Sequence, residues 1–127
     1  MGQKPIYDPI RRMSKQEINA AIRENDSKKL SIAVISAALY SGDGVWAEKL
    51  AYKLIDHPDH LVRGNAMLSL GHIARVHGTL DRDRAIDVLR VAMNDRDEYV
   101  RTHASDARDD VEHWIKRSGR WLGQDSP

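Results

Sequence analysis

The stretch that decides the fold reads His57-Pro58-Asp59-His60-Leu61-Val62-Arg63-Gly64-Asn65-Ala66. Its pattern of an Asp, a Val-Arg pair and an Ala returns 38 residues later, within residues 95–104. Asp is a favoured residue at a helix N-cap, and Val and Ala four residues apart lie on one face of a helix. A pattern repeated at a fixed period indicates structural units that bury their apolar faces by stacking on one another. The sequence therefore predicts stacked helical repeats.

Apolar residues at helical spacing predict further helices on both sides of this stretch. The clearest stripe steps by four, three, four and three residues: Val100, Ala104, Ala107, Val111 and Trp114. The helices are expected to cover the following ranges: about 15–24, 28–40, 45–56, 60–77, 81–94 and 100–114. No segment alternates with a period of two over the length of a strand. The expected fold class is all-α, an α-α superhelix of about three antiparallel helix pairs.

Two segments without helical periodicity flank the expected helices. Pro5 and Pro9 lie in residues 1–13, which we expect to form an extended N-terminal arm. Ser14 begins a capping-box spacing, so the domain of stacked helical repeats is expected to cover residues 14–118. Residues 119–127 are expected to form a C-terminal tail.

The composition excludes several classes of protein. The chain has 127 residues and no cysteine, which fits one domain and excludes thiol catalysis, iron–sulfur clusters and zinc sites with cysteine ligands. The longest apolar stretch, residues 30–40, is shorter than the roughly 20 residues of a membrane span, and no apolar signal segment follows Met1. We therefore expect a cytoplasmic protein with no membrane partner. A net charge of +1 gives no global argument for binding nucleic acid.

Residues 57–66 and 95–104 resemble the turn and the start of the second helix in HEAT repeats, a family of α-solenoids. The resemblance covers about residues 45–115, and the rhythm of helix pairs extends it to residues 15–40. It implies core positions for two valines and a polar ladder between repeats for two arginines: Val62, Val100, Arg63 and Arg101. The chain has His57 where the family usually has Asp. This departure counts against the usual polar ladder at this turn.

At a finer level, residues 70–81, 94–95 and 104–112 resemble small bacterial HEAT-like proteins found beside polymorphic or contact-dependent inhibition (CDI) toxins. This resemblance implies an immunity protein that binds and neutralises a cognate toxin domain, often a nuclease. A general scaffold or adaptor role is the alternative that the broader HEAT resemblance leaves open.

An acidic cluster near the C-terminus is the candidate partner-binding site. Residues 81–112 carry ten acidic and six basic side chains. The candidate residues follow one another within two helical turns: Asp106, Asp109, Asp110, Glu112 and His113. Carboxylates on a concave surface can enter the cationic cleft of a nuclease and speed association. The alternative is an ordinary solvated helix face on which Arg108 and Lys116 pair with these acids.

Each of the three tryptophans has a structural interpretation, and Trp46 also has a binding interpretation. Trp46 lies beside the Gly42–Gly44 loop, where it either packs the first helix pair against the second or serves as a half-exposed interface anchor. Trp114 falls on the apolar stripe, which indicates a core position. Trp121 lies in the expected tail, where it is expected to cover the end of the stack.

Catalytic, metal and cofactor chemistry find no support in the sequence. The six histidines form no recognised zinc array, and no glycine-rich phosphate loop is present. We therefore expect no enzyme, no metal and no cofactor. Nucleic-acid binding is a rival to protein binding, because basic residues occur at both ends of the chain: Arg11, Arg12, Lys15, Lys28, Lys29, Lys116, Arg117 and Arg120. The acidic cluster argues against this rival.

Overall fold

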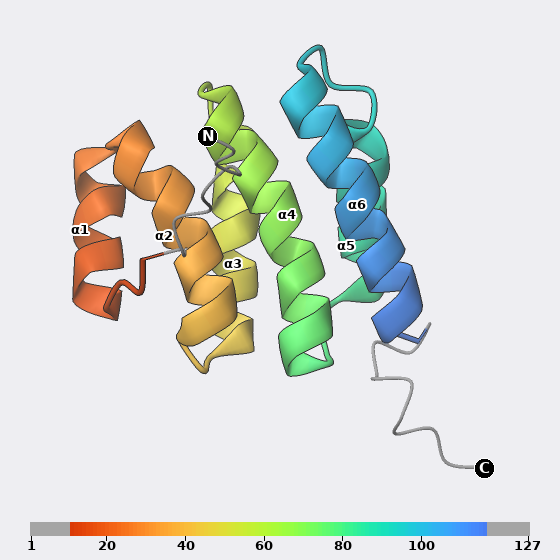
Figure 1. Cartoon of the computed structure of the whole chain (residues 1–127), viewed down its shortest axis with the longest axis horizontal. Helices are drawn as coiled ribbons and strands as arrows, with labels where there is room; N and C mark the ends of the chain where they lie inside the picture. The colour runs from red at the N-terminus through yellow and green to blue at the C-terminus, as the bar shows by residue number, and fades with distance from the viewer. Residues whose placement is uncertain (1–10, 117–127) are drawn as a thin grey trace, which may run out of the picture.

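The structure, a computed structural model, describes residues 11–116 as an all-α fold (Figure 1). Its helices form three consecutive pairs: α1 (Lys15–Glu24) with α2 (Ser27–Tyr40), α3 (Gly44–Leu54) with α4 (His60–His77), and α5 (Arg82–Ala92) with α6 (Glu98–Trp114). The all-α class and the three antiparallel pairs predicted from the sequence are confirmed. The packing of the helices fits a superhelical arrangement.

Aspartate caps begin most of these helices. Five helices have an Asp at the N-cap whose side chain accepts a backbone N–H of the first turn: Asp26, Asp43, Asp59, Asp81 and Asp97. Ser14 and Glu17 form the predicted capping box at the start of α1. Such side chains satisfy backbone donors that have no partner inside the helix. The local sequence therefore determines where each helix begins.

The ends of two helices differ from the sequence-based ranges. α3 ends at Leu54 and α5 ends at Ala92, each two residues before the predicted end. The N–H groups of Asn94 and Asp95 bond to carbonyls three residues earlier, at 3.0 Å each, which turns the chain out of α5. α4 ends as predicted, because Gly78 adopts the left-handed conformation with φ of 71°.

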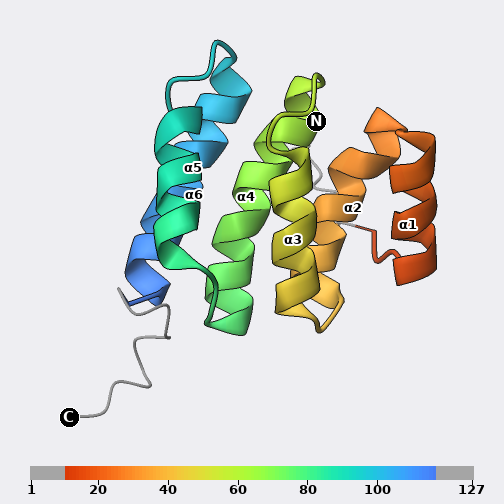
Figure 2. The same ribbon diagram turned by 180° about the vertical axis from the view of Figure 1, so that it is seen from behind.

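The second helices of the pairs form one layer in which α4 lies between α2 and α6 (Figure 1). The helices α3 and α5 lie on the far side of this layer, as the view from behind shows (Figure 2). α1 packs against α2 at one end of the stack. The chain thus builds a stack whose consecutive pairs touch mainly through their second helices.

Small residues bring α4 and α6 close together. A Cβ atom on Gly71 would lie 3.0 Å from the Cα of Ala107, and a Cβ on Gly64 would lie 2.5 Å from the ring of Tyr99. Ala104, which lies on the same stripe as Ala107, is completely buried. We refer to this contact between α4 and α6 as the seam.

The core runs along the stack and is filled mainly by aliphatic side chains. Completely or almost completely buried members come from most of the elements: Ile18, Leu30, Val34, Leu70, Ile73, Leu89, Val111 and Ile115. Both repeat valines, Val62 and Val100, are also fully buried. Their burial contributes roughly 1.5–3 kcal/mol per large aliphatic side chain before entropic costs are counted.

The ends of the chain are described only in part. Met13, the last residue of the expected arm, is buried, and its N–H donates to Oγ of Ser36 over 2.8 Å. Residues 1–10 of the expected arm lie outside the described residues, as do residues 117–127 with the expected tail and Trp121. Between residues 11 and 116, no helix is both long enough and apolar enough to cross a membrane.

Candidate protein-binding face

The turns before α4 and α6 are joined by an ion pair between Arg63 and Asp95. Arg63 is only 7% exposed, and its Nε and Nη2 donate to the two carboxylate oxygens of Asp95 over 3.1 and 2.9 Å. Its Nη1 also donates to the carbonyls of His57 and Pro58. The hydrogen bonds from Arg63 lower the pKa of the Asp95 carboxyl. Arg101 is exposed and donates to the carbonyl of Asp95 over 2.8 Å.

His57 has the same local role in its turn as Asp95 in the next one. Nδ1 of His57 accepts the N–H of Asp59 over 3.0 Å, just as Oδ1 of Asp95 accepts the N–H of Asp97 over 2.9 Å. Because Nδ1 is an acceptor, the ring proton lies on Nε2, which faces Oδ1 of Asn25 at 2.9 Å. Polar contacts therefore connect all three turns, with a histidine–amide contact between the first two pairs.

A second polar connection crosses the layer of second helices. Asn65 of α4 donates from Nδ2 to the carbonyl of Ser31 in α2 over 2.8 Å. Its Oδ1 accepts the hydroxyl of Tyr99 in α6. Sequence reasoning singled out neither side chain, because an Asn inside a helix carries no signal that distinguishes a bridging residue from a solvated one. The bridge fixes α4 relative to both neighbours.

Two histidines lie along the seam. The ring of His103 stacks on that of Tyr99 with centroids 4.2 Å apart, and its Nδ1 is buried without a hydrogen-bond partner in residues 11–116. Burial lowers the pKa of His103. Burial, helped by the charge of Arg75, lowers the pKa of His72 to about 4, and Nη2 of Arg75 lies 2.9 Å from Nδ1 of His72. Both rings are therefore neutral near pH 7.

The predicted acidic cluster divides between the two sides of α6. Asp110 is half-buried on the side of the seam, where Oδ2 lies close to Gly71, and burial raises the pKa of its carboxyl. Glu112 lies on the other side, with Oε1 3.6 Å from Nε of Arg108. This distance is longer than a hydrogen bond. The pairing with Arg108 that the solvated alternative expected is present for Glu112.

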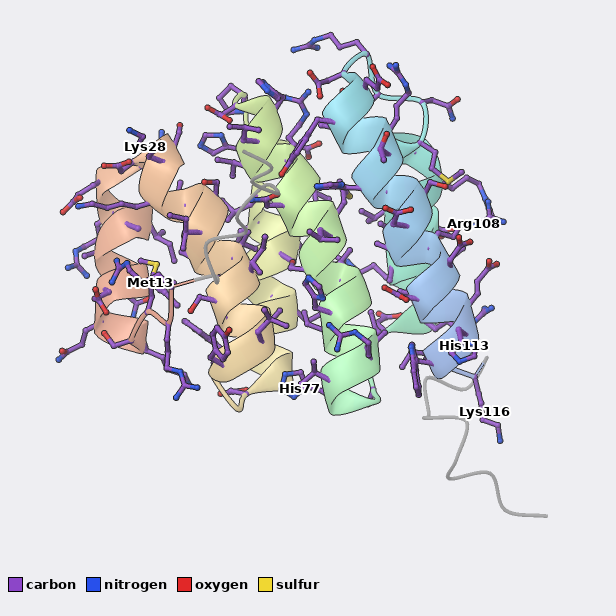
Figure 3. All side chains as sticks on the ribbon, in the orientation of Figure 1. Met13, Lys28, His77, Arg108, His113 and Lys116 are labelled. Atoms are coloured by element: carbon purple, nitrogen blue, oxygen red, sulfur yellow. The ribbon has the colours of Figure 1, made fainter. Side chains whose placement is uncertain are left out.

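The other members of the cluster remain open to solvent. Asp106, Asp109 and His113 are exposed, and neither aspartate forms an ion pair within the described part of the chain. Figure 3 shows His113 near the C-terminal end of α6 and Arg108 on the side turned away from α4. The sulfur of Met93 in α5 lies 3.9 Å from Nη1 of Arg108. Among the exposed acids of this cluster, Asp106 and Asp109 therefore carry negative charges that no ion pair balances within the described residues.

Trp46 packs between the first and second helix pairs and is partly covered. It lies against the core, and the Nζ of Lys15 lies 4.8 Å from the centroid of its ring. The same Nζ donates to Asp43 over 2.9 Å. Trp114 is also half-buried and packs against the core. Because Lys15 lies over its ring, Trp46 offers a partner less exposed surface than an uncovered tryptophan would.

The cations considered for nucleic-acid binding have local partners in α1 and its surroundings. Arg11 pairs with Glu17 at 2.9 Å, and Lys29 pairs with Glu24 at 3.3 Å. Arg12 lies over the ring of Tyr40 at 4.7 Å. Lys28 is exposed, whereas Arg117 and Arg120 lie outside the described residues. Most of the positive charge at this end of the stack is therefore locally engaged.

Within residues 11–116, no group of three or more His, Asp or Glu side chains is placed to hold a metal ion. The histidines instead serve different local contacts. Besides His57, His72 and His103, His77 has its Nε2 2.9 Å from the carbonyl of Ala38 and lies between the ends of α2 and α4 (Figure 3).

The arrangement of helices is similar to that of a chain in a solved complex. No family model matches the chain, and no curated protein sequence matches it. A chain in the crystal structure of a CDI complex from Cupriavidus taiwanensis LMG 19424 has a similar fold, with a TM-score of 0.73 and 28% sequence identity. The similarity covers 86% of this chain and 96% of that one. The fold is therefore that of a chain from a CDI complex, and the comparison does not single out the HEAT family.

Proposed function

We propose that this protein is a non-catalytic immunity protein of a contact-dependent inhibition system, which binds and neutralises a cognate toxin domain. The observation that carries the proposal is the similarity to a chain of a CDI complex over 86% of this chain. At 28% identity the similarity extends to sequence as well as to fold. A nuclease is the toxin class that the exposed acids favour.

The proposed contact surface is the layer of α2, α4 and α6, with the exposed acids of α6 as its charged part. Asp106 and Asp109 have no internal partner in the described residues, so a cationic group of a partner can approach them without displacing an ion pair. A nuclease must present cations to bind phosphates. Complementary charges of this kind speed association and select the partner.

Rigidity of this surface supports the same proposal. The bridge through Asn65 and the close seam hold α2, α4 and α6 in a fixed arrangement. A surface that is ordered before binding loses less conformational entropy when the complex forms. We also propose that the repeats are HEAT-like and that Arg63 and Asp95 form the polar ladder between two of them.

The test expresses the domain encoded by the reading frame next to this gene, as the candidate toxin. We expect its expression to arrest cell growth and co-expression of this protein to restore growth. Titration calorimetry of the purified pair then measures affinity for the double variant Asp106→Asn/Asp109→Asn. Loss of two complementary charges is expected to weaken binding about tenfold or more at low salt.

A matched variant, Asp83→Asn/Glu24→Gln, removes the same charge from exposed acids on α5 and α1. We expect its affinity to equal that of the unchanged protein. Failure of the protein to restore growth and to bind would refute the immunity function. Binding that is equally strong in all three proteins would leave the function intact and place the contact surface elsewhere. A general scaffold would restore no growth.

A further inference from the structure

An open groove is lined by residues that follow the end of α3, by α4 and by α5. The helices α3 and α5 lie on the side of the stack seen in Figure 2. The groove has a volume of about 470 Å³, within the range of roughly 300–1,000 Å³ typical of ligand sites. Its floor comes from Met67 of α4 and its walls from four aliphatic side chains: Ile55, Val88, Val91 and Ala92. Val91 is 75% exposed, more than the other large apolar side chains in residues 11–116.

Polar and aromatic side chains connect α3 and α5 next to the groove. At the start of α5, the guanidinium of Arg84 lies 3.8 Å from the ring centroid of Tyr52 in α3. Glu48 accepts the hydroxyl of Tyr52 over 2.9 Å and the N–H of Asp81 over 3.0 Å. These bulky and polar groups bridge the two helices. The apolar lining lies next to this bridge, at Ile55 just after the end of α3 and at Val88, Val91 and Ala92 in the second half of α5.

The rim of the groove is negative. Asp56 and Asp87 are exposed, and the only cation within 4.0 Å of either, among the described residues, is Arg90, at 3.8 Å from Asp87. Asp95 also lines the groove, but its charge is balanced by Arg63. The C-terminal ends of α3 and α5 add the negative ends of their helix dipoles. A ligand therefore meets an apolar floor within a negative rim.

We propose that this groove is a docking site for a cationic amphipathic segment of a protein partner. Apolar side chains of the segment contact Met67 and Val91, and its Lys or Arg side chains lie beside Asp56 and Asp87. Amphipathic helices commonly bind apolar grooves in this way. The site goes beyond the proposed toxin contact, because it lies on the other side of the layer and involves none of the acids of α6.

The test uses two fluorescent model helical peptides, one built of Leu and Lys and one built of Leu and Glu. Fluorescence anisotropy measures binding at several salt concentrations. We expect the Leu/Lys peptide to bind and the Leu/Glu peptide not to bind. The variant Val91→Arg places a bulky cation in the wall of the groove and is expected to weaken Leu/Lys binding about tenfold. Asp56→Asn/Asp87→Asn is expected to weaken it and to reduce its salt dependence.

The control is Val45→Arg, which makes the same substitution at an exposed valine, 64% exposed, at the start of α3. We expect this variant to bind like the unchanged protein. The proposal is overturned if neither peptide binds, if both bind equally, or if Val91→Arg and Val45→Arg behave alike. A concentration-dependent dimer in sedimentation that Val91→Arg abolishes would also overturn it, because a second copy would then be the occupant.

Discussion

The seam between α4 and α6 and the groove between α3 and α5 show opposite outcomes of helix packing in one stack. α4 and α6 have 18 and 17 residues and meet through glycine and alanine, so their backbones come close together. α3 and α5 have 11 residues each and are bridged by Tyr52 in the last turn of α3 and Arg84 in the first turn of α5. The size of the side chains at a contact decides how closely two helices approach. The seam therefore holds the stack together, whereas the groove leaves apolar surface available for a partner.

Among the variants that test this comparison, leaving aside the core control, the largest effect is expected when a bulky side chain forces the seam apart. Gly71→Val adds three carbon atoms where a single Cβ would already lie 3.0 Å from the Cα of Ala107. We expect the free energy of unfolding to fall by about 3 kcal/mol, because α6 must move away from α4. Chemical denaturation measures this change. Thr102→Val, on the exposed side of α6, is the control, and a similar loss in both variants would contradict the prediction.

A smaller loss is expected when the ladder beside the groove is cut. Asp95→Asn removes the charge that faces the buried guanidinium of Arg63 and is expected to cost about 2 kcal/mol. Because Arg63 lowers the pKa of Asp95 in the fold, the stabilisation is present above the unfolded pKa near 3.8 and is lost as pH falls through the folded pKa. Denaturation at neutral pH and in acid measures both effects, and Asp83→Asn serves as the control. Equal losses in the two variants would exclude a structural role of the pair.

The seam also predicts a dependence of stability on mild acid. The pKa of His72 is lowered from 6.5 to about 4 in the fold, so the unfolded chain binds a proton at higher pH than the folded chain. Stability is therefore fully present above about pH 6.5 and falls as the pH decreases toward 4. We expect His72→Gln to make this fall shallower, with the remainder due to His103. Urea denaturation at several pH values between about pH 7 and 5 measures how the free energy of unfolding changes with pH. The same dependence on pH in His72→Gln and in the unchanged protein would contradict this assignment.

The smallest effect is expected in the wall of the groove. Val91→Ser shortens an exposed side chain that supports no helix contact across the groove, so the free energy of unfolding should change by no more than about 0.5 kcal/mol. Thermal and chemical denaturation measure the change. Leu89→Ala, on the buried side of the same helix, is expected to cost about 2–5 kcal/mol. Comparable costs at both positions would show that the groove wall belongs to the core.

Local sequence signals predicted the helices well and the candidate site less well. The aspartates and Gly78 mark the helix boundaries because capping depends only on neighbouring residues. The acids of α6 were predicted as one cluster from their spacing, yet Asp110 turns toward the seam and Glu112 toward Arg108. Spacing along one helix gives the direction of a side chain but not the neighbour that it meets.

The sequence by itself determined the all-α class, the order of the helix pairs and most helix boundaries, because apolar periodicity and capping are short-range properties of the chain. Only the tertiary structure decided that Asn65 joins three helices, that His57 reaches Asn25 and that α3 and α5 stay apart. Each of these features depends on the distance between helices that are 30 or more residues apart in the chain. That distance is fixed by the packing of side chains from both helices together, and no single segment contains it.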